Sequence, residues 1–128
     1  MSVYGIISEF NPFHNGHKYL IDTAKAEGAE AVVCVMSGNA VQRGDISVID
    51  KYYRAEMALH CGAELVLELP YPWCAAGAEA FALCGVTIAS SFADKLFFGS
   101  ECGDIALLER AADRAYKLFF IVIYKFTA

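Results

Sequence analysis

Two histidines three positions apart have the clearest chemical potential in this chain. His14 and His17 follow a short β-rich run at residues 3–8 and an Asn-Pro turn. At the start of a helix, residues three apart share a face. Gly16 has no side chain, so a ligand could approach the backbone closely. Because a helix N-terminus attracts anions, the two imidazoles could hold a phosphate there and stabilise the charge that develops when it is attacked.

The histidine pair is also compatible with two simpler roles. The histidines could be surface residues that cap a helix and do nothing more. They could also belong to a metal site, because two histidines at this spacing can share one ion. Such a site needs a third ligand, for which Glu9 and His60 are the candidates.

Apolar runs alternate with helix-like stretches along the chain, and these elements must position the histidines. The pattern predicts strands at 3–8, 31–36, 65–69 and 95–98, and helices at 14–27, 50–61, 75–90 and 104–116. Continuous apolar strands between helices predict a parallel sheet with helices on both faces, which is a Rossmann-like α/β fold. The histidines then lie beyond the carboxyl end of the first strand, where open α/β sheets bind ligands.

Helical spacing also predicts which side chains face the sheet. The residues expected inside are Tyr19, Leu20 and Ala24 in the first helix, and Tyr53, Met57 and Cys61 in the second. Asp50 precedes the second helix, and its type favours a helix cap over a catalyst.

Composition limits the class of protein. The chain has 128 residues, is 57% apolar and carries a net charge of −5, which argues against a surface that grips a nucleic-acid backbone alone. No apolar stretch approaches the roughly 20 residues of a membrane helix. The N-terminus lacks the features of a secretory signal. Five cysteines without CxxC spacing indicate reduced thiols in a cytoplasmic protein.

The C-terminal residues differ in character from the rest. The sequence predicts an α/β domain at 1–115 and an apolar tail at 116–128. The run at 118–124 could be a fifth strand of the sheet or the product of a truncation.

Five ordered segments carry a resemblance to a known family. FNPFHNGH resembles the HxGH signature of the nucleotidyltransferase superfamily. SEFNPFHNGHKYL, MSGNAVQRGD, DKYYRAEMAL, GAELVLELP and FFGSECGDI together resemble the tRNA(Met) cytidine acetate ligase family, from residue 3 to about 108. Members of that family are much longer than this chain. The resemblance therefore implies an HxGH nucleotidyltransferase-like fold in which 1–115 is an incomplete nucleotide-binding domain. It also implies that the C-terminal region expected to engage tRNA is missing.

The resemblance implies a reaction and a set of site residues. The family activates acetate with ATP as acetyl-adenylate and acetylates N4 of the wobble cytidine of elongator tRNA(Met), so ATP, Mg²⁺, acetate and that tRNA are the implied ligands. His14 and His17 are the implied catalytic residues. The implied ATP-binding residues are Ile7, Ser8, Glu9, Phe10, Asn11, Pro12, Phe13, His14, Asn15, Gly16, His17, Lys18, Tyr19, Leu20 and Gly99.

Other polar residues in the matched segments could contact substrate or phosphate. They are Gln42, Arg43, Lys51 and Arg54. Solvent-exposed positions are an equal alternative for these side chains. Two other functions stay open, a small-molecule adenylyltransferase of the same superfamily and a fragment that binds ATP without turnover. Exposed strand edges would also favour self-association.

Overall fold

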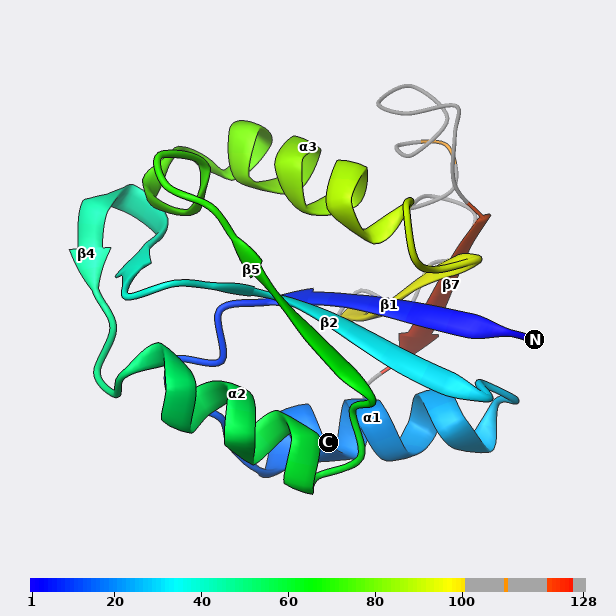
Figure 1. The fold of residues 1–128 in the computed structure, drawn as a ribbon. Helices are drawn as coiled ribbons and strands as arrows, with labels where there is room; N and C mark the ends of the chain where they lie inside the picture. The colour runs from blue at the N-terminus through cyan, green and yellow to red at the C-terminus, as the bar shows by residue number, and fades with distance from the viewer. Residues whose placement is uncertain (101–109, 111–119, 126–128) are drawn as a thin grey trace.

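The computed structural model describes residues 1–100, 110 and 120–125. A parallel five-stranded sheet, in the order β5-β2-β1-β6-β7, forms its centre (Figure 1). Its strands are β1 (Val3–Ser8), β2 (Ala31–Ser37), β5 (Leu65–Leu69), β6 (Lys95–Ser100) and β7 (Phe120–Lys125). The expected Rossmann-like α/β fold is confirmed.

Within residues 1–100, three α-helices cover the two faces of this sheet. The helices α1 (Asn15–Ala26) and α2 (Lys51–His60) lie on one face, and α3 (Ala78–Ala89) lies on the other (Figure 1). Every crossover between neighbouring parallel strands in the β1-β2-β5 half contains one of these helices, as a parallel sheet requires. The core is therefore split into two apolar layers, one beneath α1 and α2 and one beneath α3.

Shorter elements lie at the carboxyl edge of the sheet. They are a two-stranded antiparallel ladder of β3 (Ala40–Val41) and β4 (Asp45–Ile46), and the 3-10 helices η1 (Gln42–Gly44) and η2 (Trp73–Ala75). The ladder falls in the stretch 37–47 that follows the second predicted strand. The sequence does not predict these two-residue strands, because runs this short have no detectable period.

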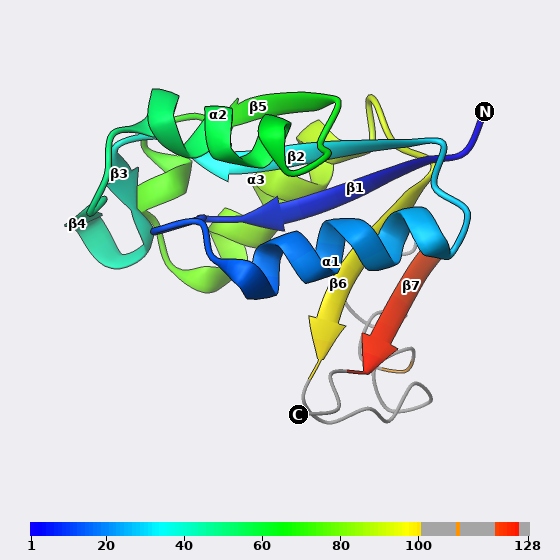
Figure 2. The same cartoon turned by 90° about the horizontal axis from the view of Figure 1, so that it is seen from below.

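The two sides of β1 differ in how closely the strands pair. β1 pairs with β2 along its whole length, from Val3–Ala31 to Ser8–Met36. With β6 it pairs only at Tyr4–Lys95 and Gly5–Leu96. Beyond these pairs β6 turns away from β1, together with β7 (Figure 2). The sheet thus opens between β1 and β6 at their carboxyl ends, at the point where the order of strands reverses.

The predicted inner faces of two helices need correction. In α1 the buried residues are Ile21, Thr23 and Ala24, whereas Tyr19 is 47% exposed. In α2 the buried residues are Arg54 and Ala58, one position along from the predicted Tyr53 and Met57. Large apolar side chains were expected inside. Here the small Ala58 is buried in the core layer instead, and the partly buried Ala55 packs against that layer.

The apolar C-terminal run forms β7, which pairs in parallel with β6 from Lys95–Phe120 to Ser100–Lys125. The predicted helix at 104–116 lies outside the described residues, apart from the helical Arg110. No helix in the described part of the chain is long and apolar enough to cross a membrane.

Candidate active site: the HxGH turn

The two histidines belong to the HxGH turn, residues 14–17, and are held by the first turn of α1. His14 is the N-cap, and its Nδ1 accepts a hydrogen bond from the Gly16 N–H at 3.1 Å. His17, at the third helical position, accepts a hydrogen bond from the His14 N–H on its own Nδ1 at 3.2 Å. This is a reciprocal capping box in which imidazoles replace the usual Ser and Glu.

The capping bonds determine where the ring protons lie. A neutral imidazole has one N–H and one acceptor nitrogen. Since both Nδ1 atoms accept hydrogen bonds from the backbone, the proton of each neutral ring is on Nε2. His14 and His17 therefore each keep an Nε2–H donor for another partner, at the positive end of a helix.

The rings are packed against each other and against two aromatic residues. The His14 and His17 centroids are 3.8 Å apart, with 27° between the ring planes. The His17 ring also lies edge-on to Phe10 at 4.9 Å, and 5.4 Å from Phe13. Burial, reinforced by the neighbouring His14, lowers the pKa of His17 to about 4. His17 is thus a neutral donor at neutral pH.

The structure explains why position 16 of this motif is a glycine. A Cβ atom at this position would lie 2.9 Å from Cε1 and 3.0 Å from Nδ1 of the His14 ring. The ring can reach the Gly16 N–H only because that space is empty. This requirement exists without any ligand, so it adds to the predicted role of Gly16 in letting a ligand approach.

The loop between β1 and α1 is tied to the β3–β4 region. The Glu9 carboxylate accepts a hydrogen bond from the Gln42 N–H at 2.8 Å, and Asn11 Oδ1 accepts one from the Val48 N–H at 2.7 Å. Phe10 is 1% exposed and has a φ of 47°, a left-handed conformation that costs energy in a non-glycine residue. The surrounding bonds hold this strained conformation in place.

The remaining candidates from 7–20 have varied surroundings. The Ile7 side chain packs into the core layer beneath α3, and the Leu20 side chain packs into the layer beneath α1 and α2. The Ser8 hydroxyl accepts a hydrogen bond from the Phe10 N–H. Lys18 pairs with Asp22 one turn along the helix. Pro12, Asn15 and Tyr19 are exposed, and Gly99 is exposed near the end of β6.

The four further candidates are not gathered at one point. Lys51 pairs with Glu68 at 2.7 Å, and Arg43 is exposed with a φ of 67°. Gln42 contributes its backbone N–H to the Glu9 carboxylate. Arg54 is 0% exposed, so neither of the expected positions, facing nucleotide or facing solvent, describes it. Its guanidinium binds backbone carbonyls inside the protein.

A metal site at the histidines gains no support from the geometry. Within residues 1–100, 110 and 120–125, no group of three or more His, Cys, Asp and Glu side chains could hold an ion. His60, one candidate third ligand, lies at the far end of α2 beside Glu56. The other, Glu9, is engaged with Gln42.

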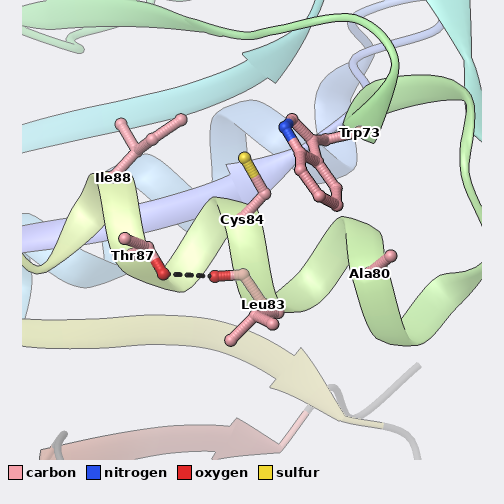
Figure 3. A pocket seen from close by; sticks show the side chains of 6 residues that line it. All are labelled: Trp73, Ala80, Leu83, Cys84, Thr87 and Ile88. Atoms are coloured by element: carbon pink, nitrogen blue, oxygen red, sulfur yellow. Dashed lines mark hydrogen bonds between the residues drawn. The ribbon is translucent and has the colours of Figure 1, made fainter.

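An apolar pocket of about 280 Å³ is lined mainly by residues of α3 (Figure 3), the helix on the opposite face of the sheet from α1 (Figure 1). Trp73 and Cys84 line one side of it, with Leu83 and Ile88 along the helix. Apolar side chains make up most of its lining, and it offers no cluster of polar groups for a phosphate. The chemistry of this pocket therefore differs from that of the turn.

A family model for the HIGH nucleotidyl transferases matches residues 1–118. The chain belongs to this family. It is also similar to proteins named tRNA(Met) cytidine acetate ligase, with 48% identity over 114 residues to the one from Syntrophotalea carbinolica and 49% over 115 residues to the one from Acetivibrio thermocellus. These alignments cover 88% of this chain but only 27% and 28% of the relatives.

A solved structure agrees with both family and fold. The structure of Thermotoga maritima TmcAL bound with alpha-thio ATP superposes with a TM-score of 0.84 at 42% identity. It covers 91% of this chain and 29% of that chain. The HIGH nucleotidyl transferase fold expected from the HxGH signature is thus confirmed, in a chain that spans less than a third of the length of these relatives.

Sequence reasoning found the HxGH turn but missed much of its support. The capping role of the imidazoles was only one of the open alternatives, and the buried guanidinium of Arg54 was not foreseen. A signal did exist for Arg54, because it falls between Ala55 and Tyr53 on a helix whose inner stripe includes Ala58. An arginine four residues before a buried alanine shares that alanine's face.

Proposed function

We propose that this HIGH nucleotidyl transferase chain carries the ATP-binding part of a tRNA(Met) cytidine acetate ligase. The enzyme activates acetate with ATP and then acetylates N4 of the wobble cytidine of elongator tRNA(Met). The observation that carries the proposal is the pair of Nε2–H donors at the N-terminus of α1. The 48% and 49% identity with proteins of that name supports the choice among the reactions of the superfamily.

The proposed site is the strand–loop–helix of residues 7–20 together with Gly99. The triphosphate would lie at the first turn of α1, between the diverging ends of β1 and β6. His14 and His17 would donate their Nε2–H groups to phosphate oxygens. Ile7 and Leu20 would take part through the backbone, since their side chains pack into the core.

In the first step a carboxylate oxygen of acetate attacks the α-phosphorus in line. An O–P bond forms, the bridging bond to the β-phosphate breaks, and pyrophosphate leaves with its electron pair. Negative charge grows on the α-phosphate and the leaving group. The Nε2–H donors fixed by the capping box would stabilise that charge without reorganising, so they act by positioning and electrostatics.

In the second step the cytidine N4 attacks the acetyl carbonyl carbon. AMP leaves and N4 loses a proton. With a net charge of −5, this chain is poorly suited to bind tRNA alone. We therefore assign tRNA binding chiefly to the part of the ligase relatives that lies beyond the matched segment.

Mg²⁺ would accompany the triphosphate and neutralise part of its charge. The nearby carboxylates are already engaged, Glu9 by Gln42 and Glu68 by Lys51. The donor set therefore suits an ion held mainly by phosphate oxygens and water rather than by a protein cage. Lys51 and the exposed Arg43 remain candidates for contacts with phosphate or acetate.

Acetate-dependent exchange of radiolabelled pyrophosphate into ATP tests the proposal. Exchange that requires acetate supports the ligase half-reaction. Exchange that requires a nucleotide or phosphopantetheine-like acceptor would support the alternative adenylyltransferase. Calorimetric ATP binding without any exchange would identify a binding-only chain, an outcome consistent with a span of less than a third of the relatives. Light scattering in the same buffer tests the expected self-association.

A further inference from the structure

Arg54 is the largest fully buried side chain in the part of the molecule that the structure describes. Its guanidinium donates hydrogen bonds to backbone carbonyls. Nε donates to Ile49 at 2.8 Å, and Nη1 donates to Glu9 at 2.6 Å and to Ser37 at 3.2 Å. Nη2 donates to the carbonyl of Gly38.

These acceptors belong to three segments that are separate in sequence. Glu9 follows β1, Ser37 is the last residue of β2 with Gly38 directly after it, and Ile49 precedes α2. Carbonyl oxygens carry negative partial charge, so their convergence without a donor would leave them unpaired and mutually repelling. A planar guanidinium can bind several of them at once. An ammonium group has neither the flat fork nor the same reach.

The charge of Arg54 has no carboxylate directly against it among the described residues. Burial lowers the pKa of Arg54, while the more distant charges of Asp50, Glu9 and Glu68 raise it. Arginine nevertheless stays protonated in proteins. A fixed positive charge therefore lies directly behind the loop that leads to the histidines.

That loop connects Arg54 to the site through a short series of contacts. The Glu9 carbonyl is bound by Arg54, and the Glu9 carboxylate by Gln42. The next residue, Phe10, has the strained φ of 47° and packs against the His17 ring. A change in the direction of the Glu9 carbonyl would rotate the peptide before Phe10 and displace this packing.

We propose that Arg54 is a positioning residue, which fixes the Glu9 carbonyl and thereby orients the His14–His17 pair toward the triphosphate. The identity of the ligand, a triphosphate, rests on the proposed function. The role of Arg54 in holding the loop and the histidines does not depend on that function. Arg54 contacts no substrate in this role and acts through the loop.

The first test needs no nucleotide. In the wild-type chain, 15N spectra of the imidazoles should show His17 as the Nε2–H tautomer, as the capping box requires. Arg54→Lys keeps the charge but loses the fork, so a mixture of tautomers is expected at His17. Lys25→Met is the matched control, because it removes one exposed positive charge near the other end of α1 and should leave the tautomer unchanged.

The second test compares ATP with adenosine by calorimetry. If Arg54 orients the phosphate donors, Arg54→Lys should weaken ATP binding about tenfold or more while changing adenosine binding less than about threefold. A general destabilisation of the fold would instead lower the affinities for ATP and for adenosine by similar factors. A wild-type tautomer in Arg54→Lys, with an unchanged ratio of the two affinities, overturns the inference.

A third measurement applies if Arg54→Lys does not fold. Titrating His17 through its pKa of about 4 in the wild-type chain should shift the Arg54 Nε signal. The same acidification of a His17→Gln variant, which keeps a capping acceptor but takes up no proton at position 17, reveals the contribution of nearby carboxylates. Identical Arg54 shifts in both proteins would overturn the inference. If the wild-type chain binds no ATP, the proposed function fails, while the tautomer and titration results still decide the role of Arg54.

Discussion

The ring of His14 stacks on the ring of His17 at 3.8 Å, and each ring accepts a backbone N–H from the same helical turn through Nδ1. The bonding pattern is that of a Ser-x-x-Glu capping box. A capping box needs acceptors only, so Ser and Glu would serve the helix equally well. What the imidazoles add is a pair of Nε2–H donors, which the capping box does not need and which the proposed triphosphate would use.

Replacing the two histidines by the usual Ser and Glu of a capping box should therefore weaken ATP binding without destabilising the fold. For the double variant His14→Ser and His17→Glu, we expect the free energy of unfolding in urea to stay within about 1 kcal/mol of wild type, because both capping acceptors are retained. ATP affinity should fall about 100-fold or more, since two donors are lost and a carboxylate is added beside the phosphates. Calorimetry measures the affinity.

The control for this variant is Glu27→Gln at the other end of α1, which should change neither quantity. Retained ATP binding in the double variant would remove the histidines from the site. A loss of stability well beyond that range would mean that packing on Phe10 and Phe13 is what the rings supply.

The lowered pKa of His17 predicts a pH dependence of stability. The pKa is about 4 in the folded chain, against an ordinary value of 6.5. Above pH 6.5 both states hold a neutral ring. As the pH falls further, the unfolded state takes up the proton first, so the free energy of unfolding decreases until about pH 4. Urea unfolding between pH 7 and pH 4 measures the decrease.

Comparison with His17→Gln isolates this effect from the titration of carboxylates. The variant keeps a capping acceptor but cannot take up the proton, so its stability should decrease less over the same range. His60→Gln, at an exposed position, should behave as wild type does. Parallel curves for wild type and His17→Gln would contradict the lowered pKa.

The sequence carried enough information for the sheet and for the turn. Apolar runs such as 31–36 are long enough to have one interpretation, and an Asn-Pro turn before HNGH marks a helix start. Helix faces were less predictable. Tyr53 and Arg54 are adjacent, and hydrophobicity favours burying the tyrosine. The converging carbonyls of Glu9, Ser37 and Gly38 reverse this preference, because they bind the guanidinium.

Long-range ties between loops were also beyond prediction from the sequence. The bond from Val48 to Asn11 and that from Gln42 to Glu9 join segments that are more than thirty residues apart. A backbone N–H has the same chemistry in every residue, so no residue type signals such a bond in advance. These hydrogen bonds can be recognised only in the folded structure, where the parallel sheet brings the ends of β1 and β2 together.

Glu64 should stabilise the amino end of β2. Its carboxylate accepts a hydrogen bond from the buried Val32 N–H at 2.6 Å and pairs with Lys25 at 2.6 Å. Burial opposes ionisation of Glu64, but these hydrogen bonds outweigh it and lower the pKa of Glu64.

Glu64→Ala should lower the free energy of unfolding in urea by about 1–2 kcal/mol, because the Val32 N–H loses its side-chain acceptor. Glu56→Ala, at an exposed contact with His60, should cost less than about 0.5 kcal/mol. Equal losses would refute the assignment.

Gly85 sets how closely α3 approaches the sheet beneath it. Alanine in a helix is favoured over glycine by about 1 kcal/mol. A Cβ at position 85, however, would lie 2.9 Å from Cγ2 of Ile7 and 3.3 Å from Leu69. The Ile7 methyl group is on a stiff, β-branched side chain at the centre of the sheet, so steric overlap outweighs helix propensity. Gly85→Ala should therefore destabilise the fold by about 1–2 kcal/mol.

Gly77→Ala is the control, because position 77 has open space around it and an ordinary φ of −64°. Thermal unfolding should place this variant within about 1 kcal/mol of wild type. If Gly85→Ala raised the melting temperature, α3 would have room to move outward from β1, and the close packing of this layer would not constrain the strand that carries the HxGH turn.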